Sequence, residues 1–95
     1  GEACISYSLA SRTMAFDIHE RKFSSEICGL FGMDSGLFST PVEPDGKIGR
    51  LLSEVARQTG LSSQTAVFAG GHDQPCAAVG AGALVQGEAV DTIGT

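Results

Sequence analysis

The sequence VFAGGHDQ at residues 67–74 joins an apolar run to two glycines, a histidine and a carboxylate. Residues 65–69 have the length and the flanking residues of a short buried strand. Pro75 suits the first turn of a helix, which we predict over Cys76–Leu84, and a further strand is predicted over Glu88–Ile93. Strand, glycine turn and helix in this order form the unit from which α/β proteins are built.

The first third of the chain predicts a similar alternation of elements. Apolar side chains at every second position over residues 13–18 indicate a half-buried strand, although the same side chains also fit one face of a helix. A helix capped by Ser24 or Ser25 is predicted next, and Gly32 or Gly36 would end it. A strand and a helix therefore precede the middle of the chain.

The middle of the chain contains turn signals and one ambiguous segment. Turn chemistry predicts a loop over residues 34–46 that closes in a tight Pro-Asp-Gly turn. Residues 47–60 fit either one helix or an extended piece followed by a helix over Glu54–Thr59, and we favour the second because Ser53 can cap that helix. Gly60 would be its C-terminal glycine. The alternating order of elements predicts an α/β fold.

Composition excludes several classes of protein. The chain has 95 residues, 42% of them hydrophobic, which allows one modest core and at most one domain, and it lacks an apolar run long enough to span a membrane. A formal charge of −5 with only 6 Lys and Arg gives no attraction for nucleic acid. Its 3 cysteines fit neither a disulfide framework nor paired zinc ligands. We expect a reduced, cytoplasmic protein, of which this chain is a piece.

Asp73 and Gln74 are the strongest candidates for a functional site. Asp73 falls between a predicted strand and a predicted helix, where open α/β sheets bind ligands beyond the carboxyl ends of their strands. The alternative is that Asp73 only caps the helix that follows. Gln74 can hydrogen-bond a hydroxylated ligand, or it can be an ordinary exposed residue at a helix start.

Other motifs carry weaker signals. His72 and Cys76 lie close to Asp73 in sequence, but a zinc site needs three or four convergent ligands, so we expect no metal site made of side chains. The glycines lack the spacing of the dinucleotide fingerprint, which argues against a dinucleotide-dependent oxidoreductase. Gly94 and Thr95 follow a predicted strand, where free backbone N–H groups either hold phosphate oxygens or simply form a turn.

Several of these features occur together in one known family. Residues 8–18 read SLASRTMAFDI, and Asp73 and Thr95 are separated by a glycine-rich predicted helix. In these features, in their spacing and in the order of its segments, the chain resembles the FGGY family of carbohydrate kinases, which includes glycerol kinase, xylulokinase and gluconate kinase. The resemblance extends over essentially the whole chain.

The resemblance implies a function for each candidate residue. Asp73 would be the catalytic carboxylate and would contact the substrate, Gln74 would bind substrate hydroxyls, and Gly94 and Thr95 would belong to the phosphate site for ATP. The implied reaction is transfer of a phosphoryl group from ATP, with Mg²⁺, to a hydroxyl of a sugar or polyol. Neither nucleic acid nor a membrane is an expected partner.

The resemblance also implies an architecture. FGGY kinases have two actin-like (ribonuclease H-like) domains that close on ATP and sugar, so residues 1–78 would finish the first domain and residues 79–95 would begin the second. Ser6 and Phe23 depart from residues common in the family, which leaves the substrate open. A non-catalytic actin-like ligand-binding module is the alternative function. We also expect this chain to be inactive alone and to self-associate through exposed apolar surface.

Overall fold

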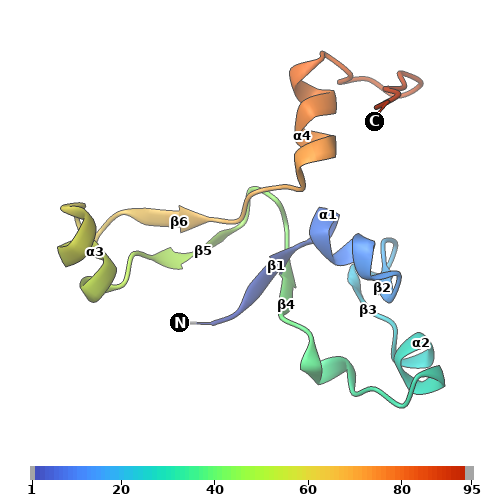
Figure 1. Ribbon diagram of the computed structural model, residues 1–95, viewed down its shortest axis with the longest axis horizontal. Helices are drawn as coiled ribbons and strands as arrows, with labels where there is room; N and C mark the ends of the chain where they lie inside the picture. The colour runs from blue at the N-terminus through green and yellow to red at the C-terminus, as the bar shows by residue number, and fades with distance from the viewer. Residues whose placement is uncertain (1, 94–95) are drawn as a thin grey trace.

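The computed structural model describes residues 2–93, in which short helices and strands alternate (Figure 1). The strands are β1 (Cys4–Ser6), β2 (Phe16–Asp17), β3 (Lys22–Phe23), β4 (Thr40–Val42), β5 (Lys47–Arg50) and β6 (Ala66–Phe68). The α-helices are α1 (Tyr7–Ala10), α2 (Ser25–Leu30), α3 (Ser53–Thr59) and α4 (Asp73–Gly80), and the 3₁₀ turns are η1 (Ser11–Thr13) and η2 (Ser35–Leu37). The chain is therefore a mixed α/β structure.

The described strands form pairs rather than one continuous sheet. β1 pairs with β4 in parallel, and the segment between them contains α1, the β2–β3 hairpin and α2. β2 and β3 are antiparallel, with Phe16 opposite Phe23. β5 and β6 are also antiparallel, and their register shifts between Lys47 and Gly49. Parallel strands need a long crossover between them. The pair therefore joins a strand from the first third of the chain to one from the second third.

A row of aromatic rings forms the core beside β1 and β4. Tyr7 packs against Phe16 with ring centroids 5.4 Å apart, Phe16 meets Phe23 edge-on at 5.5 Å, and Phe23 stacks on Phe38 at 4.1 Å. Phe16 is only 8% exposed. These offset and edge-to-face contacts tie α1 and the hairpin to the segment that leads into β4.

The second half of the chain extends away from this core. Figure 1 shows β5, β6 and α3 reaching to one side of the β1–β4 pair, while α4 projects in another direction. The Cα radius of gyration is 16.5 Å, whereas a compact domain of this length has about 12 Å. The two halves therefore differ in how much of their surface they bury within the chain.

The predicted cap at Ser24, the predicted helix end at Gly60 and the predicted tight turn are confirmed. The side chain of Ser24 accepts an amide hydrogen bond in the first turn of α2, and Gly32 follows that helix with a φ of 64°. Gly60 ends α3 in the left-handed region with a φ of 74°. The predicted tight turn closes through the Gly46 amide, which donates to the carbonyl of Glu43 at 2.9 Å. Each of these signals depends only on residues close in sequence.

Two predictions for the first half are wrong in part. Only Phe16–Asp17 of the predicted strand 13–18 is extended. Met14 is left-handed, with a φ of 59°, and is 84% exposed, while Ile18 is 64% exposed, because the 3₁₀ turn η1 precedes this strand and breaks the alternation. The predicted loop 34–46 contains η2 and also β4, which forms because β1 offers it hydrogen-bonding partners.

The second half also differs from the sequence-based expectation. α4 starts and ends earlier than the predicted helix 76–84, and Leu52, not Ser53, is the N-cap of α3 and makes no side-chain cap bond. β6 forms where predicted but is not buried, since Phe68 is 57% exposed. Among the described residues, 88–93 form no strand, because no neighbouring strand pairs with them.

Candidate functional site

Asp73 is the first residue of α4 and follows β6 through the connection 69–72 (Figure 1). The amide of Ala69 donates to the carbonyl of Gly46 at 2.9 Å, which fixes the start of the connection beside the turn before β5. The carboxylate of Asp73 is 80% exposed. The strand, glycine turn and helix therefore present this carboxylate to solvent.

The hydrogen bonds of the first turn of α4 show how the Asp73 carboxylate is held. His72 is the N-cap, and its Nδ1 accepts from the Gln74 amide at 3.3 Å, while Asp73 Oδ1 accepts from the same amide at 2.8 Å. Capping is therefore shared, and the N-cap position itself belongs to His72. Within the described residues Asp73 Oδ2 accepts no hydrogen bond, which leaves it open to a ligand.

Gln74, the second candidate substrate-binding residue, lies next to Asp73 in the same helical turn. It is exposed, so its side-chain amide is open to solvent. The structure thus brings both candidate residues to the same end of α4, on adjacent positions. A carboxylate acceptor beside a side-chain amide is a combination suited to hydroxyl groups.

A contact from the other end of the chain reaches this turn. The amide of His72 donates to Ser8 Oγ at 2.8 Å, across 64 positions of sequence. Ser8 Oγ also lies 3.2 Å from Ser6 Oγ, and Ser6 caps α1 by accepting from the Leu9 amide at 3.4 Å. The start of α1 and the start of α4 are therefore linked by serine hydroxyls, which the sequence did not reveal.

Gly71 allows the connection to pack closely against α4. A Cβ at Gly71 would lie 2.9 Å from Cys76 Sγ and 3.7 Å from Ser8 Oγ, whereas a Cβ at Gly70 would meet nothing within 4 Å. Only one of the two glycines is therefore required by space. Cys76, which the sequence placed near Asp73, is exposed and lies with its Sγ next to Gly71.

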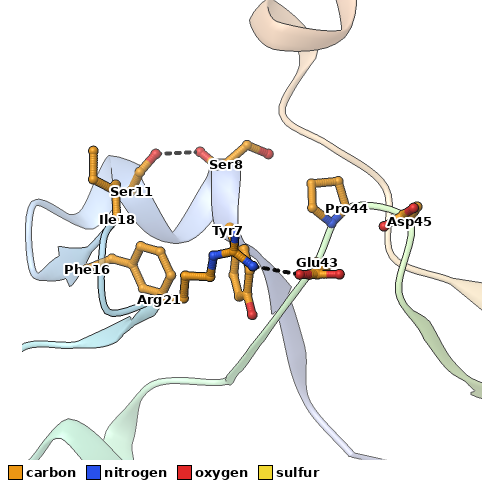
Figure 2. A pocket seen from close by; sticks show the side chains of 9 residues that line it. All are labelled: Tyr7, Ser8, Ser11, Phe16, Ile18, Arg21, Glu43, Pro44 and Asp45. Atoms are coloured by element: carbon orange, nitrogen blue, oxygen red, sulfur yellow. Dashed lines mark hydrogen bonds and ion pairs between the residues drawn. The ribbon is translucent and has the colours of Figure 1, made fainter.

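Two hollows lie on either side of Ser8. The hollow beside α4 has a volume of about 320 Å³ and is lined by Ser8, Pro44, Gly71, Pro75, Cys76 and Val79. The hollow beside α1 has a volume of about 370 Å³ and is lined by Tyr7, Ser8, Ser11, Phe16, Ile18, Arg21, Glu43, Pro44 and Asp45 (Figure 2). Asp73 lines neither hollow, so a substrate in front of it would need further walls.

The hollow beside α1 contains an ion pair that the sequence did not predict. Arg21 Nη1 donates to Glu43 Oε1 at 2.8 Å, and the guanidinium lies 5.9 Å from the centre of the Tyr7 ring. Figure 2 shows the guanidinium over the Tyr7 ring, pointing toward Glu43. The side chains of Arg21 and Glu43 are 60% and 55% exposed, so the pair contributes little to stability.

The cofactor-binding candidates Gly94 and Thr95 lie outside the described residues. Within residues 2–93, no three His, Cys, Asp or Glu side chains are grouped so that they could hold a metal ion. In the same part of the chain, every helix is too short or too polar to cross a bilayer. The described site therefore consists of the carboxylate, its neighbouring amide and the serine link.

Comparison with known proteins relates most of the chain to one family. Residues 1–80 match the N-terminal domain of the FGGY family of carbohydrate kinases. The chain is 39% identical over 89 residues to a xylulose kinase of Bacillus subtilis, covering 94% of this chain and 18% of that protein. It is 39% identical over 95 residues to an L-fuculokinase of Salmonella typhi, covering 100% of this chain and 20% of that protein.

The chain thus spans about a fifth of the length of the curated relatives it matches. An L-fuculokinase of Escherichia coli K12 is 36% identical over 95 residues, again covering 100% of this chain and 20% of the relative. The family match includes the strand, the glycine turn and all of α4. From its match over residues 1–80, the chain belongs to the FGGY family of carbohydrate kinases.

Proposed function

We propose that the natural polypeptide containing this chain transfers a phosphoryl group from ATP to a hydroxyl of a sugar or polyol. Family membership and the sugar kinases among its relatives support this proposal. The observation that carries it is the Asp73 carboxylate, which sits at the strand–helix junction, is 80% exposed and has one oxygen free of hydrogen bonds from described residues.

The residues of this chain have distinct functions in the proposed reaction. Asp73 accepts a hydrogen bond from the attacking hydroxyl and takes its proton as the bond to phosphorus forms. Gln74 binds neighbouring hydroxyls and so orients the substrate. Since phosphoryl transfer depends mainly on positioning and charge stabilisation, the rigidity of the turn that holds Asp73 matters as much as the carboxylate itself.

ATP and Mg²⁺ are part of the proposal, with the metal neutralising charge on the phosphates. Gly94 and Thr95 are proposed to contact the ATP phosphates through backbone N–H groups and a hydroxyl. Within residues 2–93 no three His, Cys, Asp or Glu side chains are grouped to hold a metal ion, and Mg²⁺ is proposed to be held mainly through the ATP phosphates. The described residues Asp73 and Gln74 contribute the part of the proposed site that contacts the hydroxyl groups of the sugar or polyol.

The proposed whole protein has two actin-like domains, with residues 1–78 completing the first and residues 79–95 beginning the second. Closure of the domains would supply the walls that the structure lacks in front of Asp73. The isolated chain is therefore proposed to be inactive. Xylulose and L-fuculose are the first sugars to test, because relatives are named for kinases that act on them.

A direct test uses the natural polypeptide with ATP, Mg²⁺ and a panel of sugars and polyols that begins with xylulose and L-fuculose. Formation of a sugar phosphate is followed by ³¹P NMR, and the isolated 95-residue chain is the control. We expect one class of sugar to be phosphorylated by the natural polypeptide only. Sugar binding without any phosphorylated product across the panel would contradict the proposal and favour a non-catalytic ligand-binding module.

A further inference from the structure

We infer that Ser8 is a positioning residue for the Asp73 carboxylate, an inference that rests on the proposed function. Ser8 lies in α1, and its Oγ accepts the amide hydrogen of His72, the residue directly before Asp73, at 2.8 Å. Ser8 is half-buried, and it touches the Asp73 turn from the opposite end of the sequence.

The connection 69–72 is held at both of its ends. At its start the Ala69 amide donates to the Gly46 carbonyl at 2.9 Å, and at its end the His72 amide donates to Ser8 Oγ. Between these two bonds lie Gly70 and Gly71, which restrict the backbone least of all residues. The direction in which α4 leaves the connection therefore depends on the serine hydroxyl.

Ser8 is itself fixed by local contacts. Its Oγ lies 3.2 Å from Ser6 Oγ, and its carbonyl accepts from Ser11 Oγ at 2.8 Å. Ser8 therefore belongs to α1, the helix that packs against the aromatic core through Tyr7. Removal of the Ser8 hydroxyl would leave the His72 amide without its partner and would free the turn to move.

Such movement would affect the reaction more than the binding of substrates. A displacement of the reacting groups by about 1 Å can lower turnover by about 10²-fold. The remainder of the sugar site, outside the described residues, would still bind the sugar. We therefore expect Ser8→Ala to lower kcat about 10- to 100-fold with little change in the Kd for sugar.

The test uses the natural polypeptide with three variants. Ser8→Ala removes the hydroxyl, Ser8→Thr keeps it, and Ser62→Ala is the matched control, since Ser62 Oγ also accepts a backbone amide hydrogen, that of Gln64 at 3.1 Å, but in the exposed connection between α3 and β6. Hydrogen exchange of the His72 amide reports the bond directly. We expect this amide to exchange at least about 10-fold faster in Ser8→Ala, and to be restored by Ser8→Thr.

Kinetics with the sugar that the panel identifies completes the test. Asp73→Asn is measured alone and combined with Ser8→Ala. If Ser8 acts through Asp73, Ser8→Ala lowers kcat in the wild type but lowers residual turnover of Asp73→Asn by less than about twofold. Ser8→Thr restores kcat, and Ser62→Ala leaves it unchanged.

The outcomes separate this inference from the proposed function. If Asp73→Asn is inactive while Ser8→Ala keeps wild-type kcat or wild-type exchange at His72, the positioning role is overturned and the proposed function stands. An equal loss from Ser8→Ala in both backgrounds also overturns it, because the effect would not pass through Asp73. Full turnover by Asp73→Asn overturns the catalytic role of Asp73 and with it the inference, although phosphoryl transfer itself would stand. A wild type without turnover overturns the proposed function and the inference together.

Discussion

The N-terminal region, residues 2–42, and the C-terminal region, residues 43–93, bury their side chains very differently. Buried residues of the N-terminal region are Ser6, Ala10, Ala15, Phe16 and Cys28, whereas Ala56 is the buried residue of the C-terminal region. The aromatic row also belongs to the N-terminal region. The candidate site therefore lies in the region with the smaller core.

Large apolar side chains are exposed in both regions, including Leu30 at 79% and Phe31 at 73% in the N-terminal region. In the C-terminal region Phe68 is 57%, Val79 59%, Leu84 71% and Val85 66% exposed. Burial of such side chains stabilises a protein by about 1.5–3 kcal/mol each. The relatives are about five times longer than this chain, and under the proposed function the further residues of a longer polypeptide would cover these side chains. Self-association through this surface remains a prediction for the isolated chain.

The largest expected effect on stability tests the core of the N-terminal region. Phe16→Ala removes the ring at the centre of the aromatic row and should lower the free energy of unfolding of the isolated chain by about 3–5 kcal/mol. Met14→Ala, at an exposed position, should change it by less than about 0.5 kcal/mol. Urea unfolding followed by circular dichroism measures both. An isolated chain without cooperative unfolding would contradict an independent core in this region.

A smaller effect is expected at the turn that carries the candidate site. Gly71→Ala places a Cβ 2.9 Å from Cys76 Sγ, which can rotate away, so we expect a loss of about 1 kcal/mol in the natural polypeptide. Gly70→Ala should be close to neutral there, because nothing lies within 4 Å of its added Cβ. Addition of Cys76→Ala to Gly71→Ala should recover most of the loss. Equal losses at both glycines would show that space is not the constraint.

The smallest effect concerns Asp17 in the β2–β3 hairpin. Backbone hydrogen bonds from Glu20 and then His19 lower the pKa of this carboxyl below its ordinary value. A lowered pKa in the folded state means that the stabilisation is present above the unfolded-state pKa and is lost as pH falls through the folded-state pKa. We expect Asp17→Asn to remove a small part of the acid dependence of unfolding, measured between about pH 5 and pH 2. An identical acid dependence in both proteins would show that the hairpin bonds are absent in solution.

Sequence signals confined to a few neighbouring residues predicted local structure well. The Ser24 cap, the Gly60 helix end and the turn before β5 are formed by side chains and backbone within one turn of each other. The parallel pairing of β1 with β4 was missed, since it joins segments far apart in sequence and includes Pro41, a residue typical of turns. Long-range pairing leaves little trace in a single sequence.

The candidate site shows the same limit. The strand–turn–helix pattern placed Asp73 at the start of a helix after a strand, which the structure confirms apart from the exact first residue of α4. The hydrogen bond between Ser8 and His72 could not be predicted, because it depends on the tertiary arrangement that places α1 beside the start of α4. The ion pair of Arg21 with Glu43 was missed for the same reason.

The proposed catalytic function of Asp73 is tested most directly by Asp73→Asn in the natural polypeptide, with kcat and the Kd for sugar measured on the same preparation. The amide side chain keeps the shape of the carboxylate and removes its ability to take a proton. We predict a fall in kcat of about 10²- to 10⁴-fold with sugar binding retained. A variant that phosphorylates the sugar at the wild-type rate would contradict the account.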